Sequence, residues 1–317
     1  GDDAKHLAPY CAETARCFDD LNQRLSVYLP DSELSHLNSA TGMVDVSRQT
    51  FDMLRETARY AALTEGAFDP TVSPLITMWG FSGGKTPTNL PTAAIIAATL
   101  NETGYQHLQL TPTAPSAPPV LRAGFERTGM SLDLGGIAKG FAVDRAYDHL
   151  ISTRPANTLI NLGGNIRCHG MATPERPWRI GVRHPFDTTM TLGALTMESG
   201  MSVATSGNYE RFVTIDGERY AHIIDPRTGY PVKGMAGVTV LSASATEADA
   251  LSTALFVVGI EGAPALLEKF PTTHALLVPD RTPIEIWVSP GFQRVFTPHP
   301  EYAASVHSLP MGILDKR

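Results

Sequence analysis

A short apolar stretch that runs into two glycines and then into a helical pattern constrains this chain more than any other feature. Residues 130–144 read Met-Ser-Leu-Asp-Leu-Gly-Gly-Ile-Ala-Lys-Gly-Phe-Ala-Val-Asp. The first five predict a strand that carries Asp133 near its end. From Ile137 the apolar residues recur at helical spacing, which predicts a helix. Gly135 and Gly136 lie between the two and let a ligand approach the backbone closely.

This strand, turn and helix permit two interpretations. A helix N-terminus presents free N–H groups and a positive dipole end to an anion, and Lys139 adds a full positive charge in the first turn. The simpler interpretation is a tight connection with a surface lysine, because glycine turns are common. Taken alone, the stretch leaves both open.

Length, composition and charge narrow the class of protein. The chain has 317 residues, of which 43% are hydrophobic and 18% charged, as in an ordinary globular protein with a large core. The net charge of −7 without a basic stripe argues against a nucleic-acid partner. No apolar run reaches the ~20 residues of a membrane-spanning helix, so no transmembrane segment is expected. Cys11, Cys17 and Cys168 form no Cys-x-x-Cys pair, which argues against zinc.

Periodicity, capping residues and turn signals predict a mixed α+β fold, with helices packed on largely antiparallel sheets. Helices are expected at 6–28, after an N-cap at Ser47, at 93–100, from 137, and at 247–258 after an N-cap at Thr246. Asp216-Gly217 predicts a hairpin. The expected strands lie at about 105–110, 120–126, 158–162, 178–182, 209–215, 219–224, 238–243 and 284–288. The proline-rich residues 111–119 are a possible subdomain junction within a domain of residues 1–295, and the tail 296–317 stays unassigned.

Three polar residues stand out by their positions. His222 follows a hairpin strand, where a side chain can reach a ligand, although a lone histidine is more often structural. Asp249 and Thr253 are four residues apart and therefore share one helix face. They could cap the helix and bond back to a carbonyl, or they could supply two of the hard oxygen ligands that Mg²⁺ prefers.

Several motifs, taken in order, resemble the ApbE family of flavin transferases. The resemblance covers roughly residues 26–295, and six motifs in one order are far more specific than any one of them. The motifs are Asp31-Ser-Glu-Leu-Ser35, Gly66-Ala-Phe-Asp-Pro70, Asp133-Leu-Gly-Gly-Ile-Ala-Lys-Gly140, Asn161-Leu-Gly-Gly-Asn165, Ala204–Arg211 with His222–Pro231, and Ala248–Leu255.

The resemblance implies a T-fold-like core and a set of site residues. It implies Mg²⁺ bound by Asp249, Thr253 and the carbonyl of Gly136, with His222 as the base and Lys139 as a second residue at the reaction centre. It also implies that Tyr28 lies near the flavin ring, and that FAD is held by residues drawn from Ala67, Phe68, Asp69, Asp133, Lys139, Thr205, Ser206, Gly207 and His222.

The implied reaction transfers FMN from FAD to a threonine hydroxyl of an acceptor protein and releases AMP. The acceptor would be a membrane redox subunit or a regulator. Two alternatives stay open: an FAD pyrophosphatase that uses water instead of threonine, and a flavin carrier without activity. Family members are usually exported, so the resemblance also implies a periplasmic protein anchored through a leader or lipid that this sequence lacks.

Overall fold

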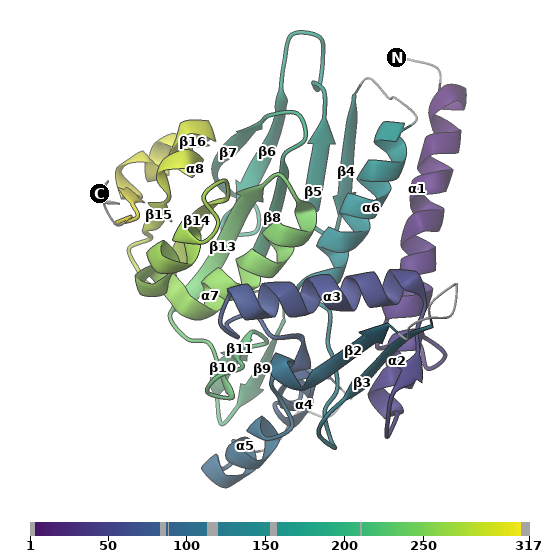
Figure 1. Ribbon diagram of the computed structural model, residues 1–317. Coiled ribbons are helices and arrows are strands. Elements are labelled where there is room, and N and C mark those ends of the chain that lie inside the picture. The colour runs from purple at the N-terminus through teal and green to yellow at the C-terminus, as the bar shows by residue number, and fades with distance from the viewer. Residues whose placement is uncertain are drawn as a thin grey trace, which may run out of the picture.

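A seven-stranded sheet crosses the molecule and carries its most buried strand near the centre (Figure 1). The computed structural model describes residues 4–82, 87, 89–112, 120–152, 157–209 and 211–311, without the side chains of 4–7. The order is β17-β15-β14-β13-β8-β5-β4, and all pairs are antiparallel except β15 with β17. The strands are β4 (Thr158–Leu162), β5 (Asn165–His169), β8 (Ser202–Gly207), β13 (Met235–Ser242), β14 (His274–Pro279), β15 (Ile286–Val288) and β17 (Val306–Ser308).

Both faces of this sheet are covered, and the strand sequences reflect it. All eight residues of β13 are buried, as expected for a strand with a layer on each side. In β14, Ala275 and Leu277 belong to one core cluster, whereas Leu276 and Val278 belong to another. The second cluster lies under a smaller sheet, β16-β7-β6, and a short helix. These elements are β6 (Trp178–Arg183), β7 (Thr191–Met197), α8 (Pro290–Val295) and β16 (Phe296–Pro298).

Helices cover the opposite face of the large sheet. α7 (Ala245–Glu268) packs on β8 and β13, and α6 (Ala138–Ser152) packs beside it on β4 and β5. α1 (Ala4–Leu25) lies against α6, as Figure 1 shows. α7 is long and apolar enough to span a membrane, contrary to the expectation from sequence, but 56% of the apolar window is buried. Its composition therefore fits a core helix.

The remaining elements form the part of the molecule drawn below α3 (Arg48–Leu63) in Figure 1. A three-stranded sheet of order β1-β3-β2 and two hairpins lie there. Their bounds are α2 (Glu33–Ser39), β1 (Val44–Asp45), η1 (Pro70–Val72), α4 (Ser73–Met78), α5 (Ala93–Leu100), η2 (Tyr105–His107), β2 (Leu108–Pro112), β3 (Leu121–Phe125), β9 (Phe212–Ile215), β10 (Glu218–Ala221), β11 (Ile224–Asp225) and β12 (Tyr230–Pro231).

Residues 296–308 complete two sheets, although the sequence predicted no structure for them. β16 pairs with β7, η3 (Pro300–Ser305) follows, and β17 pairs with β15. The possible junction at 111–119 falls mostly outside the described residues.

The fold class and most elements match the expectations, but several boundaries were wrong. Residues 130–134 form no strand within the described part of the chain. The Asn38 side chain instead donates to the Leu132 carbonyl at 2.9 Å and accepts from its N–H at 2.8 Å. The first helix ends at Leu25, so Tyr28 lies beyond it.

The N-cap of α7 was also misplaced, whereas the helix does break at the expected Gly259. Ser244, not Thr246, caps the helix, and its hydroxyl accepts from the Glu247 N–H at 3.2 Å. The helix breaks at Gly259, where φ is 65°, but it resumes and continues to Glu268. Residues 105–107 form a 3₁₀ turn instead of a strand.

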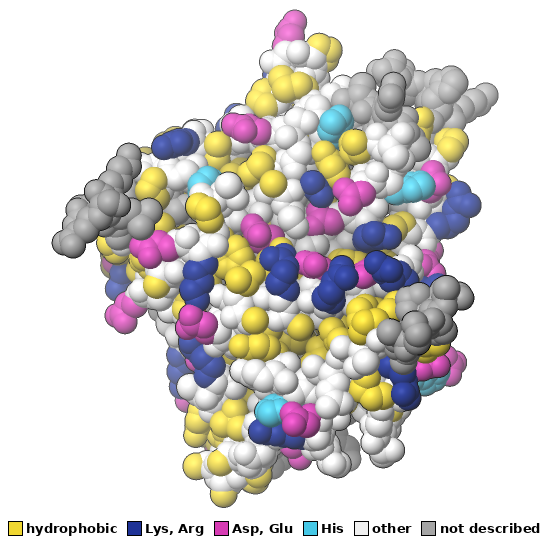
Figure 2. Space-filling view, viewed as in Figure 1, with side chains coloured by type: hydrophobic (Ala, Val, Ile, Leu, Met, Phe, Trp, Pro, Cys, Tyr) yellow, Lys and Arg dark blue, Asp and Glu magenta, His cyan; other side chains and the backbone are white. Residues whose placement is uncertain are grey.

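Basic and acidic side chains alternate on the visible face. Figure 2 shows a row of Lys and Arg side chains over α3, interrupted by acidic ones. Arg48 and Arg55 pair with Asp52, and Arg59 pairs with Glu56. These ion pairs offset the row's positive charge, in keeping with the net charge of −7.

Candidate active site

All but one of the expected site residues line one cavity of about 340 Å³, although they come from five separate segments. The cavity lies where α6, α7 and β8 meet the loop after α3 and the hairpin β9–β10. Every site residue that the sequence analysis names, except Tyr28, is part of its wall: Ala67, Phe68, Asp69, Asp133, Gly136, Lys139, Thr205, Ser206, Gly207, His222, Asp249 and Thr253.

Tyr28 lies in a neighbouring groove instead. The groove shares Asp133, Gly135, Lys139 and Arg211 with the cavity, so the two are continuous. Tyr28 is 69% exposed, and its hydroxyl accepts a hydrogen bond from Arg211 Nη1 at 3.4 Å. The tyrosine is therefore a surface residue beside the cavity, not a core residue that closes a helix.

Local hydrogen bonds shape the turn before α6. The Asp133 carboxylate accepts from the Gly135 N–H at 2.7 Å, which closes the turn between residues 133 and 135. Lys139 Nζ donates to the Gly135 carbonyl at 2.9 Å. Lys139 also lies 3.6 Å from the Asp249 carboxylate. Its ammonium group thus joins the glycine turn to α7.

Asp249 is a nearly buried carboxylate that faces the cavity. The residue is 4% exposed, and its Oδ2 accepts from the Gly140 N–H at 2.9 Å. Burial raises its pKa, and the Lys139 charge and the Gly140 N–H offset only part of that increase. A carboxylate in such a place gains from a further cation, because a buried charge is costly unless it is paired.

Thr253 and the glycine turn approach each other closely. A Cβ atom on Gly136 would lie 3.0 Å from Thr253 Oγ1 and 3.4 Å from the Phe68 ring. Ser206 Oγ lies 3.5 Å from Thr253 Oγ1 and 2.7 Å from Ser252 Oγ. Glycine at 136 therefore lets the main chain come close to α7.

These oxygens suit a hard divalent cation. Among the described residues, no group of three or more His, Cys, Asp or Glu side chains is placed to hold a metal ion. A cation here would need the hydroxyl of Thr253 and main-chain oxygen besides the carboxylate of Asp249. Mg²⁺ accepts such a set, since it typically takes one or two carboxylates and completes its shell with water and substrate phosphate. The residues present therefore fit Mg²⁺.

His222 lies across the cavity with a defined tautomer. Its Nδ1 is 3.0 Å from the Arg211 carbonyl. Because a carbonyl can only accept, Nδ1 carries the proton and Nε2 is the unprotonated nitrogen of the neutral ring. Burial lowers the pKa of His222, and the positive charges of Arg211 and Lys139 lower it further. The ring is thus a neutral base at neutral pH.

The residues after α3 bring backbone to the cavity. Asp69 is buried, and its carboxylate accepts from the N–H and hydroxyl of Thr71 at 2.8 and 2.6 Å and from the Tyr105 N–H at 2.9 Å. Both carboxylate oxygens are therefore engaged in shaping the turn. Ala67 and Phe68 next to it line the cavity.

Arg211 is the main wall residue that the sequence analysis did not name. Its Nη2 donates to the Phe81 carbonyl at 2.9 Å, and its side chain borders both the cavity and the groove. It is the second cation of the cavity wall, besides Lys139. The available signal was its place at the end of the Ala204–Arg211 motif.

Thr205 lines the cavity from β8. Its hydroxyl forms a hydrogen bond with Thr239 on the neighbouring β13 at 2.9 Å. Gly163 from the Asn161–Asn165 motif also lines the cavity. The motif therefore supplies a glycine to this wall.

Known proteins share this sequence and fold. The chain is 36% identical to an FAD:protein FMN transferase of Vibrio cholerae over 81% of this chain and 75% of that protein. It is 31% identical to one of Salmonella typhimurium over 92% and 83%.

Solved structures agree. The ApbE protein of Thermotoga maritima matches with a TM-score of 0.82 at 33% identity, over 92% of each chain. The apo form of the Pseudomonas stutzeri flavinyl transferase ApbE matches with 0.78 at 30% identity, over 91% of this chain and 88% of that one. The sequence model of the ApbE family matches residues 4–277. The chain therefore belongs to the ApbE family.

Proposed function

We propose that this protein transfers FMN from FAD to a threonine hydroxyl of an acceptor protein, with Mg²⁺, and releases AMP. The names of its relatives support the transfer reaction. One observation carries the proposal for this chain: α7 brings Asp249 and Thr253 against the Gly136 turn, with Lys139 and His222 in the same cavity wall. A buried acid, a cation and a neutral base together suit phosphoryl transfer, which depends on positioning and charge neutralisation.

The cavity wall suggests how FAD would be held. Ala67 and Phe68 would face the adenine and ribose, with Asp69 fixing their turn. Lys139 and Arg211 would offset the charge of the pyrophosphate, and Ser206 and Gly207 would border it. The flavin ring would extend toward the groove at Tyr28.

Asp249, Thr253 and the Gly136 carbonyl would hold Mg²⁺. When bound, the ion supplies positive charge that offsets the charge of the pyrophosphate as the bond to AMP breaks. Lys139 already neutralises part of the Asp249 charge. The lysine would therefore keep the site ordered before the cation arrives.

His222 would activate the acceptor. Nε2 would take the proton of the threonine hydroxyl as its oxygen forms a bond to the FMN phosphorus and the phosphorus–oxygen bond to AMP breaks. The products are the threonyl ester of FMN, AMP and a protonated histidine, which then loses its proton to water. A flavin carrier would need no base, so a neutral histidine with an unprotonated Nε2 favours an enzyme.

The acceptor and the compartment rest on the family resemblance. We propose an acceptor that is a membrane redox subunit or regulator with an exposed threonine, and work in the periplasm. Fractionation of cells that produce the full-length protein tests the second point, because recovery in the cytoplasm would contradict it.

The decisive assay follows AMP and the acceptor together. The protein is incubated with FAD and Mg²⁺, with and without an acceptor identified by co-expression and mass spectrometry. We expect AMP only with the acceptor, in a 1:1 ratio to an FMN-sized mass increase on one threonine. Rapid AMP release without acceptor would favour the pyrophosphatase, and stable FAD under both conditions would favour the carrier.

A further inference from the structure

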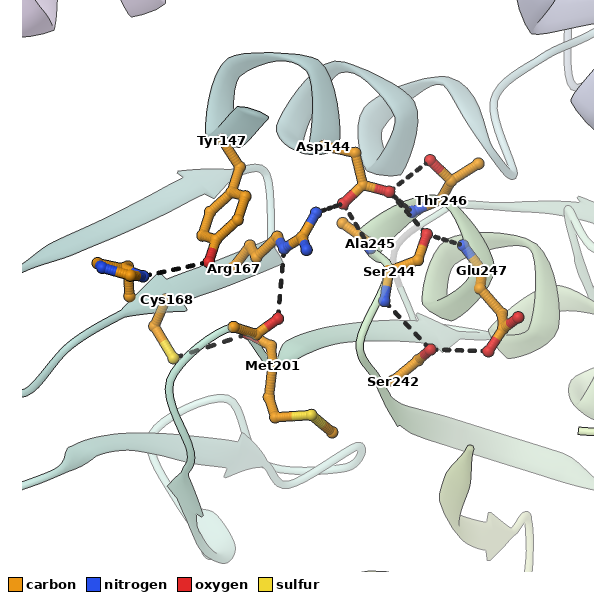
Figure 3. Close-up of polar contacts among 12 residues, drawn as sticks. Asp144, Tyr147, Arg167, Cys168, Met201, Ser242, Ser244, Ala245, Thr246 and Glu247 are labelled. Carbon is orange, nitrogen blue, oxygen red and sulfur yellow. Dashed lines mark hydrogen bonds and ion pairs between the residues drawn. The ribbon is translucent and has the colours of Figure 1, made fainter. Parts of the chain in front are cut away.

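Each of the helices α6 and α7 carries a carboxylate that accepts a hydrogen bond from the backbone of the other helix. Asp249 of α7 accepts from the Gly140 N–H of α6. Asp144, one turn further along α6, accepts from α7: from the Ala245 N–H at 2.8 Å and the Thr246 N–H at 2.9 Å. Figure 3 shows the Asp144 carboxylate between Arg167 and the first turn of α7. Each helix thus fixes the backbone of the other.

Asp144 is fully engaged. Its oxygens also accept from the hydroxyls of Ser244 and Thr246, both at 2.7 Å, and from Arg167 Nη1 at 2.5 Å. The carboxylate and the guanidinium are only 14% and 15% exposed. Arg167 lies over the Tyr147 ring at 3.8 Å, which holds it in place. A buried acid with five donors has one stable position.

Close packing makes this position matter for the cavity. A Cβ on Gly140 would lie 2.2 Å from the Ala245 carbonyl and 2.8 Å from Asp249 Cβ, so the helices touch at this point. The helices also contact each other at many further residues. Asp144 sets the register of this packing, because it binds the first N–H groups of α7, one turn before Asp249 and two turns before Thr253.

We propose that Asp144 is a positioning residue, which sets α7 on α6 so that Asp249 and Thr253 meet the Gly136 turn. The inference rests on the proposed Mg²⁺ site and adds a residue that itself touches neither cation nor substrate. Partners that orient metal ligands typically contribute 10–100-fold to metal affinity. Loss of Asp144 is therefore expected to weaken the cation site at a distance.

The test measures Mn²⁺, used in place of Mg²⁺, through the electron paramagnetic resonance signal of the free ion, with and without FAD. Asp144→Asn keeps the shape of the side chain. It replaces one accepting oxygen with an NH₂ group, which cannot accept the hydrogen bonds that the five donors offer. We expect its Mn²⁺ dissociation constant to rise about 10–100-fold. Thr246→Val removes one of the five donors and is expected to raise it about three- to fivefold.

Matched variants separate positioning from stability. Ser47→Ala removes an N-cap of the same kind from α3, away from the cavity; it should lower the melting temperature and leave Mn²⁺ affinity unchanged. Unchanged affinity in folded Asp144→Asn would overturn the inference. If that variant does not fold, Thr246→Val decides, and wild-type affinity there would overturn it.

Asp249→Ala keeps the two proposals distinguishable. If it binds Mn²⁺ as the wild type does, the proposed cation site itself fails. If Asp249→Ala loses the ion while Asp144→Asn retains it, only the positioning role is wrong.

Discussion

The two sides of the cavity are built in opposite ways. On the α6–α7 side, Asp249 is 4% exposed, and both helices are locked together by carboxylate–amide bonds. On the hairpin side, Tyr28 is 69% exposed and Phe212 in β9 is 49% exposed. His222 follows this hairpin and is held to the backbone of Arg211.

The difference fits what each side would receive in the proposed reaction. A small cation needs ligands held within a few tenths of an ångström, which buried helices provide. A protein acceptor must bring its threonine to the base from outside, which only an open side allows. In the proposed reaction, the buried side would hold the cation and the exposed side would meet the acceptor.

The largest expected effect concerns the α6–α7 side, which is the closed side of the cavity. Asp249→Asn should lower FMN transfer about 10³-fold, because a neutral amide is a poor ligand for a hard cation. The melting temperature without metal should stay equal or rise, because burial of the Asp249 charge is costly, as its raised pKa indicates. Activity assays and calorimetry measure both. A large loss of stability would show that the carboxylate is mainly structural.

The next largest effect is expected on the hairpin side, which is the open side of the cavity. His222→Ala should lower transfer about 10²-fold or more through loss of the general base. FAD affinity, measured by flavin fluorescence, should change little because the proposed role of the ring is to take the proton of the acceptor. Normal labelling of the acceptor would exclude His222 as the base.

The pH dependence sharpens the same point. Burial lowers the pKa of His222 below its usual 6.5, so the neutral base persists under mildly acidic conditions. The transfer rate should fall only as the pH drops through this lowered pKa, by about tenfold per unit below it.

Asp249 provides the control for that profile. Its pKa is raised, so protonation there would also impair the reaction at low pH. If protonation of Asp249 causes the fall of the rate at low pH, the midpoint should shift with Mg²⁺ concentration. If protonation of His222 causes it, the midpoint should not shift. An acid limb with a midpoint above 6.5 at saturating Mg²⁺ would contradict the assignment to His222.

The smallest effect concerns packing on the closed side. Gly140→Ala would force a Cβ to within 2.2 Å of the Ala245 carbonyl. Overpacking of this kind typically costs about 1–3 kcal/mol of unfolding free energy. Gly42→Ala is the control, because its Cβ would meet nothing within 4 Å. Equal urea midpoints for the two variants would show that the helices are not in tight contact.

The sequence predicted those elements that are determined by residues next to each other in the chain. Asp216-Gly217 turns the hairpin because both residues adopt positive φ, 52° and 79°, as a tight hairpin turn requires. Ser47 caps α3 through its own next turn, with its hydroxyl 3.3 Å from the Thr50 N–H. The site residues emerged from motifs, because five of the six motifs supply residues to the cavity wall.

The predictions that failed depend on hydrogen-bond partners that lie far away in the sequence. In place of a strand at residues 130–134, Asn38, 94 positions from Leu132 in the sequence, supplies hydrogen bonds to Leu132. Thr246 appeared to be an N-cap, but Asp144 of another helix binds its hydroxyl. No local pattern reveals either partner.

A crystal of the protein with FAD and Mn²⁺ tests the central claim most directly, because the anomalous signal locates the ion. The account predicts one ion between α7 and the glycine turn, within about 2.0–2.3 Å of Asp249, Thr253 and the Gly136 carbonyl, and next to the pyrophosphate. An ion that contacts the pyrophosphate but neither Asp249 nor Thr253 would contradict it.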